Sequence, residues 1–227
     1  MTNFDIKIVS DTVCPWCYVG KKRLEKGIAA YKEKHPEAND TFSTTWYPFY
    51  LVPDAPKNVD KQQYYFSRFG EARTKMMNER MAQLGQAEGI NFKFGGKTGN
   101  TRDSHRLVQL GKKKSPQQQT RVIEELFAAY FENEKDITSH QVLLETGVKA
   151  GLAEAEVEEW LSDGKGGAEV DKEVQDAYEQ NISGVPNFTI NDKFEVGGAQ
   201  EPSAFIQLFE RLKRQEASNI TVSANMC

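Results

Sequence analysis

The sequence predicts an α/β protein in which two segments far apart in the chain form one β-sheet, with a helical domain inserted between them. Residues 4–49 carry a strand, a helix and a second strand, each with the matching hydrophobic period. Strand signals are missing between about residues 60 and 180, where helical patterns follow one another. They return at residues 187–196, directly before a final helix. The order is therefore βαβ, a block of helices, and ββα, for which one sheet interrupted by an insertion is the simplest architecture.

The composition limits the class of function. The chain has 227 residues, enough for one or two domains with a sizeable core. Its formal net charge of −4 leaves no basic footprint, which argues against a nucleic-acid partner. No apolar run is as long as a membrane helix, and the N-terminus has neither the basic nor the apolar region of a secretory signal. We therefore expect a cytoplasmic protein that does not enter a membrane.

The first strand is predicted at residues 4–9, where Phe4, Ile6 and Ile8 alternate with charged side chains. The helix that follows, over about residues 14–34, has apolar residues spaced along one face and Lys and Glu on the others. A second strand at residues 41–49 is rich in β-branched and aromatic residues. The three elements form a βαβ unit, so we expect parallel strands and a right-handed crossover.

The sequence CPWC, at residues 14–17, stands at the start of that helix. Pro15 fits only the first turn of a helix, where its missing N–H costs nothing. Cys14 and Cys17 therefore lie one turn apart on the same face. Free amides and the positive dipole end at a helix N-terminus stabilise a thiolate. We expect Cys14 to be the more exposed thiol, with a lowered pKa, and to act as the nucleophile, while Cys17 resolves the mixed disulfide.

Two other interpretations of the cysteine pair stay open. The pair could form half of a zinc site, but the remaining candidates show no paired spacing. These candidates are Cys227, His35, His105 and His140. The pair could also be two inert buried thiols. Redox chemistry is favoured, because an isolated C-x-x-C between a strand and a helix in a reducing compartment is more often catalytic than structural.

The inserted segment is predicted to be entirely helical. Its expected helices span residues 61–84 (interrupted around 69–70), 100–113, 117–131, 141–150, 154–161 and 168–181, with a loop at residues 88–98. After it, a hairpin turns at residues 191–193, and Pro202 opens a final helix that ends near Ala217. The predicted domains are residues 1–58 with 182–217, the insertion 59–181, and a flexible tail 218–227.

Several short motifs, spread over residues 4–213, carry a family resemblance. They are SDTVCPWC at residues 10–17, NTRDSHRL at 100–107, AYF at 129–131, GVPNF at 184–188 and GGAQ at 197–200. Together they resemble the thioredoxin-fold proteins of the DsbA group, and most closely the FrnE-like branch. Ser104 stands where this branch has Ala, and Asn187 stands where it commonly has a hydrophobic or aromatic residue.

The resemblance implies a thioredoxin-like fold and a dithiol–disulfide oxidoreductase or isomerase. It also implies that the Val185–Pro186 bond is cis and that its loop faces the C-x-x-C. An extended substrate could then pair with the Val185 backbone, and Pro15 and Trp16 could contact it. Kappa-class glutathione transferases and 2-hydroxychromene-2-carboxylate isomerases are similar, but carry a serine where Cys14 stands and use glutathione. Both cysteines are present here, which favours dithiol chemistry.

Two further residues are candidates for auxiliary roles. His105 could carry a proton near the thiols, although a lone histidine on a structural helix more often has a purely structural role. Asp11 could alter a thiol pKa, or could equally cap the following helix. Aromatic residues of the insertion are expected in the core rather than in a ligand site. These are Tyr64, Tyr65, Phe66, Phe92 and Phe94.

The leading hypothesis is therefore a thiol–disulfide oxidoreductase that acts on cysteine-containing proteins or on small thiols and disulfides. It needs no bound cofactor and no metal, with glutathione as a possible co-substrate. The first alternative is a glutathione-dependent transferase or isomerase, and the second is a non-enzymatic metal- or peptide-binding module. The substrate, the redox partner, the direction of electron flow and a possible homodimer stay open at this point.

Overall fold

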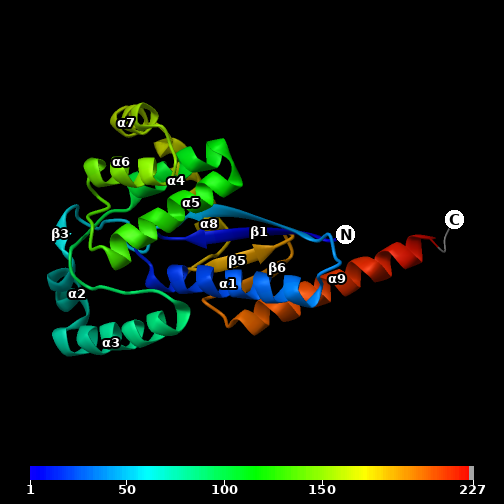
Figure 1. Ribbon diagram of the computed structural model, residues 1–227. Coiled ribbons are helices and arrows are strands. Elements are labelled where there is room, and N and C mark those ends of the chain that lie inside the picture. The colour runs from blue at the N-terminus through cyan, green and yellow to red at the C-terminus, as the bar shows by residue number, and fades with distance from the viewer. Residues whose placement is uncertain (225–227) are drawn as a thin grey trace.

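The structure, a computed structural model, describes the backbone of residues 1–224 and the side chains of residues 1–216. Its main sheet has the strand order β2-β1-β5-β6. The strand β1 (Asn3–Ser10) pairs in parallel with β2 (Thr41–Pro48) and antiparallel with β5 (Asn187–Ile190), which pairs antiparallel with β6 (Phe194–Gly197). Both ends of the chain thus contribute to one sheet (Figure 1), as the sequence predicts.

Two helices pack side by side along this sheet. They are α1 (Pro15–Lys34) and α9 (Pro202–Ala224), which run past each other in Figure 1. A Cβ atom on Gly27 would lie only 3.0 Å from Cβ of Phe205, so a residue without a side chain allows this close approach. The final helix continues to Ala224, so its predicted end near Ala217 is wrong, because no Gly or Pro interrupts the chain there. Cys227 lies outside the described residues.

The insertion is mainly helical. Its elements are α2 (Lys61–Phe69), α3 (Glu71–Glu88), α4 (Arg102–Lys114), α5 (Pro116–Phe127), the π-helical turn η1 (Ala128–Glu132), α6 (His140–Lys149), α7 (Glu154–Ser162) and α8 (Gly167–Glu179). The helices α4, α5 and α8 contact the edge strand β2, whereas α2 and α3 lie near the start of α1 (Figure 1).

The expectation of an entirely helical insertion is wrong in one place. The strand β3 (Val59–Asp60) pairs antiparallel with β4 (Lys97–Thr98) and forms a separate two-stranded sheet. Each of these strands has two residues, too few to show an alternating pattern in the sequence. They do not join the main sheet, and the fold class is confirmed. The exact division into domains stays a prediction.

One continuous apolar core joins the sheet to the insertion. Phe4, Ile6 and Ile8 of β1 belong to the same buried cluster as Leu107 and Phe127 of the helical segment. At the edge strand β2, a side chain takes the place of a neighbouring strand. Gln119 accepts from the Trp46 backbone N–H at 3.0 Å and donates to the Trp46 carbonyl at 2.8 Å. Sheet and insertion therefore fold against each other, and the CPWC sequence lies where they meet.

Candidate functional site

The CPWC sequence forms the first turn of α1. Cys14 is the N-cap residue with extended backbone angles, and Pro15 occupies the first helical position. The Cys14 N–H donates to the Asp11 carbonyl at 3.0 Å, and the Cys17 N–H donates to the Cys14 carbonyl at 3.1 Å. Both thiols are free. The local sequence therefore places two cysteines at a helix N-terminus, one turn apart.

The two thiols differ in what they face rather than in overall exposure. Cys14 is 3% exposed and Cys17 is 1% exposed, so the expected difference in exposure is small. Cys14 lines a cavity, and Cys17 is not among the lining residues. Burial raises the pKa of the Cys17 thiol well above its usual value, and the hydrogen bond and charge of Cys14 raise it further. Cys17 is therefore held as a neutral thiol beneath Cys14.

A proline loop lies against Cys14. The Val185–Pro186 bond is cis, the configuration expected above. The Cys14 Sγ–H donates to the Val185 carbonyl at 3.6 Å, and the Gly198 N–H donates to the Pro186 carbonyl at 2.8 Å. On α1, a Cβ atom at Gly20 would lie 2.9 Å from Cγ of Pro186, so the loop approaches the helix closely because Gly20 has no side chain. The structure thus brings together the cysteines and the predicted proline loop.

The two auxiliary candidates, Asp11 and His105, lie next to each other, each 2% exposed. Asp11 Oδ2 accepts from the Leu51 N–H at 2.8 Å, and Asp11 Oδ1 lies 3.4 Å from His105 Nε2 without a hydrogen bond. His105 Nε2 lies 3.2 Å from the Phe49 carbonyl, and because a carbonyl only accepts, we assign the proton to this nitrogen. Asp11 lines the cavity beside Cys14, whereas His105 is not among the lining residues.

The cavity has a volume of about 390 Å³ and lies between the CPWC turn and the insertion. Trp16, 39% exposed, is also in its lining. Phe92 belongs to the buried core and Phe94 packs against it, as expected. Several aromatic residues of the insertion also line the cavity, which the sequence did not indicate. Those that line the cavity are Tyr64, Tyr65, Phe92 and Phe94. Sequence reasoning missed this cavity because its walls come from α2, α3 and the loop before β4, which no short-range pattern connects to Cys14.

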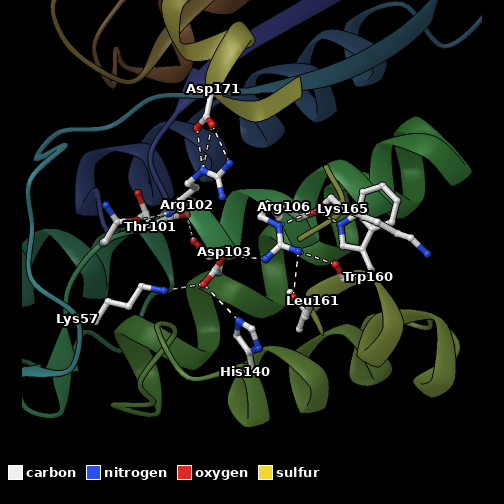
Figure 2. Close-up of polar contacts among 12 residues, drawn as sticks. Lys57, Thr101, Arg102, Asp103, Arg106, His140, Trp160, Leu161, Lys165 and Asp171 are labelled. Atoms are coloured by element: carbon white, nitrogen blue, oxygen red, sulfur yellow. Dashed lines mark hydrogen bonds and ion pairs between the residues drawn. The ribbon is translucent and has the colours of Figure 1, made fainter. Parts of the chain in front are cut away.

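A second group of charged residues is centred on the start of α4 (Figure 2). Asp103 accepts from Lys57 at 2.9 Å and from Arg106 at 2.8 Å, and His140 Nε2 lies 3.3 Å from it. Arg102 binds both carboxylate oxygens of Asp171 on α8. None of these six side chains lines the cavity, so we interpret the group as part of the framework.

The described part of the chain has neither a candidate metal site nor a candidate membrane helix. Over that part, no cluster of three or more His, Cys, Asp or Glu residues could hold a metal ion. Within the same range, no helix combines the length and apolar character needed to cross a bilayer.

A family model and several solved structures match this chain. A comparison with curated protein sequences found no match. Among solved structures, the chain is similar to a protein described as a probable DsbA oxidoreductase from Streptomyces coelicolor, with 26% identity, a TM-score of 0.82, and coverage of 92% of this chain and 89% of that one.

Two more distant structures share the fold. A 2-hydroxychromene-2-carboxylate isomerase is 16% identical, with a TM-score of 0.69 and coverage of 94% and 98%. The cytosolic disulfide reductase DsbM from Pseudomonas aeruginosa, solved with GSH, is 15% identical, with a TM-score of 0.61 and coverage of 92% and 99%. The model of the DSBA-like thioredoxin domain matches residues 5–210. The chain therefore belongs to the family of DSBA-like thioredoxin domains.

Proposed function

We propose that this protein is a thiol–disulfide oxidoreductase or isomerase in which Cys14 is the nucleophile and Cys17 the resolving thiol. Membership of the DSBA-like family supports an enzyme of the redox or isomerase kind. The observation that carries the finer assignment is the asymmetry of the two thiols. Cys14 is at the N-terminus of α1 and lines the cavity, while Cys17 is buried beneath it with a raised pKa.

The order of the reaction steps follows from which of the two thiols a substrate can reach first. The Cys14 thiolate attacks one sulfur of a substrate disulfide, a Cys14–substrate disulfide forms, and the other substrate sulfur leaves as a thiolate and takes a proton. Cys17 then loses its proton and attacks Cys14, which releases the second substrate thiol and leaves a Cys14–Cys17 disulfide. The substrate has gained two electrons and the enzyme has lost two. Two molecules of a second thiol, for which glutathione is our proposed co-substrate, return the enzyme to the dithiol and leave as their own disulfide. The reverse sequence oxidises a dithiol substrate.

Neighbouring groups supply a surface for the substrate. The Val185 carbonyl lies 3.6 Å from Cys14 Sγ, and the side chain of Trp16 is 39% exposed beside the cavity. An extended segment of a cysteine-containing substrate could lie along Val185 and Pro186 with its sulfur at Cys14, against Pro15 and Trp16. Such a substrate could be a protein or a small disulfide, and we propose that it is encountered in the cytoplasm.

Separate replacement of the two thiols tests this assignment. In the Cys17→Ser variant, attack by Cys14 should continue but resolution should stop, so mixed disulfides with a test substrate should accumulate. In the Cys14→Ser variant, both exchange and trapping should disappear. A Cys227→Ser variant is the matched control and should keep wild-type exchange rates. Mass spectrometry of the trapped species and a disulfide reductase assay measure both outcomes; a Cys14→Ser protein that still exchanges disulfides would refute the assignment.

The alternative is a glutathione-dependent transferase or isomerase. Its specific support is the aromatic cavity beside Cys14, together with the fold shared with a 2-hydroxychromene-2-carboxylate isomerase. The two functions separate at Cys17, because only dithiol chemistry needs a resolving thiol. Glutathione-dependent turnover of an electrophile that survives the Cys17→Ser replacement would favour the alternative.

A further inference from the structure

The cavity beside Cys14 has the size and lining of a small-molecule site. Its volume of about 390 Å³ falls within the range of about 300–1,000 Å³ that ligand pockets occupy. The aromatic side chains Tyr64, Tyr65, Phe92 and Phe94 form much of its wall. Such rings favour a flat apolar ligand, because stacked and edge-to-face contacts add to the gain from burial.

The charges in the cavity lining are mainly positive. Lys61, Arg68 and Lys93 contribute cationic groups, whereas Asp11 is the only acidic residue among the lining residues. Asp11 lies near Cys14, three positions before it in the chain, and its carboxylate is already engaged by the Leu51 N–H. The cavity therefore favours an anionic ligand whose charge lies away from Asp11.

Lys61 is the buried cation of this lining. It is 4% exposed, its Nζ donates to the Tyr130 carbonyl at 3.0 Å, and the same nitrogen lies 3.6 Å from the centre of the Tyr130 ring. Among the described residues, no carboxylate forms an ion pair with it. Burial lowers the pKa of Lys61 to about 8, and the charge of Glu134 opposes this only in part. An ammonium group has three donors, and one is used by the Tyr130 carbonyl.

Lys21 provides an internal comparison. It is a lysine of α1 with 2% exposure, almost the same as Lys61, but it does not line the cavity. Its Nζ binds Glu25 at 2.5 Å and Glu124 at 2.6 Å. This is the usual state of a buried lysine, because a buried charge without a partner is costly. Lys61 differs in that no carboxylate of the described residues pairs with it, and in that it lines a cavity.

We propose that the cavity binds a small organic anion with a flat apolar body, whose anionic group pairs with Lys61 and whose body lies between the aromatic walls next to Cys14. An incoming anion would supply the charge partner that Lys61 lacks, and the rings would bury its body. The claim that such an anion is a substrate of the thiol site rests on the function proposed above. The claim that the cavity binds such an anion does not depend on that function.

Two dyes that differ by one charged group test the proposal. 8-Anilinonaphthalene-1-sulfonate carries a sulfonate, and N-phenyl-1-naphthylamine has the same rings without it. Their binding is measured by calorimetry on the full-length Cys14→Ser, Cys17→Ser protein, so that thiol chemistry cannot influence the result. We expect one sulfonate dye to bind per chain. Lys61→Gln, which keeps a donor but loses the charge, should weaken binding of the sulfonate dye by about tenfold or more. The affinity for the neutral dye should change by less than about threefold.

The matched control is Lys21→Gln, which removes the charge of the other buried lysine. It should leave the affinities for both dyes unchanged, because Lys21 does not line the cavity. Equal weakening of both dyes by Lys61→Gln would show that Lys61 only shapes the wall at Tyr130, and would overturn the proposal. An unchanged affinity for the sulfonate dye in Lys61→Gln would also overturn the proposal.

A second measurement does not depend on the folding of a Lys61 variant. In the reduced wild-type protein, the sulfonate dye at about ten times its Kd should slow alkylation of Cys14 by iodoacetamide about tenfold, because the bound dye covers the thiol. Absence of protection at that concentration would overturn the location of the site. If the dye binds and protects as expected but Cys14→Ser still exchanges disulfides, only the proposed function fails.

Discussion

Two regions of this molecule that contain buried charges differ in how those charges are paired. On α4, Arg106 is 2% exposed and donates to the Asp103 carboxylate and to three backbone carbonyls, those of Trp160, Leu161 and Lys165 (Figure 2). At the cavity, Lys61 is 4% exposed and has one carbonyl and one ring as partners.

The difference indicates which region is framework and which is site. The Arg106 group fixes the end of α7 against α4, since the carbonyls at the end of a helix have no partner within it. Four of the five N–H donors of Arg106 are used within the protein, and its charge is paired with Asp103. The cavity region keeps a thiol and a cation with spare bonding capacity beside open volume. Changes on α4 should therefore affect stability, and changes at the cavity should affect chemistry.

The largest effect on stability is expected at Arg106. The Arg106→Met variant leaves three buried carbonyls and the Asp103 carboxylate without this donor. Removal of one partner from a buried ionic group costs about 3–5 kcal/mol. We expect a loss of this size in the free energy of unfolding, measured by urea denaturation, with an unchanged thiol-exchange rate for the folded protein. A loss below about 1 kcal/mol, or a slower exchange rate, would break the division into framework and site.

Asp103 should make the framework sensitive to acid. Burial alone would raise the pKa of Asp103, but its bonds to Lys57 and Arg106 hold it at about 2. Since an unfolded Asp has a pKa of about 3.9, this stability is complete above that value and is lost as the pH falls from about 4 toward 2. Asp103→Asn should therefore cost about 2–3 kcal/mol at pH 7. Its difference from wild type should shrink in urea titrations below pH 4; a constant difference would contradict the pairing.

Gly20→Ala, at the contact between α1 and the proline loop, should affect both stability and chemistry, and so sharpens the comparison. The added Cβ would lie 2.9 Å from Cγ of Pro186 and 3.1 Å from Cζ of Phe188. Overpacking costs about 1–3 kcal/mol, and Ala regains about 1 kcal/mol of helix propensity, so we expect a net loss of about 1 kcal/mol. Because the Val185 loop is pushed away from Cys14, thiol exchange should also become slower in a stopped-flow assay. An unchanged rate would mean that this loop has no part in the chemistry.

The smallest effect is expected for the pair between Arg102 and Asp171. Its geometry is bidentate, with a shortest contact of 2.7 Å, but the two side chains are 40% and 50% exposed. Exposed pairs contribute only about 0.2–1 kcal/mol and are weakened by salt. Asp171→Asn should therefore lower the free energy of unfolding by about 0.5 kcal/mol, with no effect on exchange. A loss as large as that for Arg106→Met would show that exposure is a poor guide to the strength of these pairs.

Local patterns in the sequence were sufficient for the strand, the CPWC turn and the helix that follows. Alternation in β1 and the position of Pro15 both depend on residues close together in the chain, and the structure has β1 and α1 as expected. The Val185–Pro186 loop was located only through the family resemblance, because nothing in its own sequence specifies which part of the chain it faces.

The cavity and its cation required the tertiary structure. Tyr64 and Phe92 are apolar in pattern whether they fill a core or line an open volume, and only the packing of α2 and α3 against the CPWC turn distinguishes the two. The same holds for Lys61: a lysine at the start of a helix is normally solvated, and its burial against Tyr130 depends on a segment 69 residues away. Sequence determines which groups a chain carries and the local turns they occupy, whereas packing between distant segments decides which of those groups lose water, and so which remain without a partner.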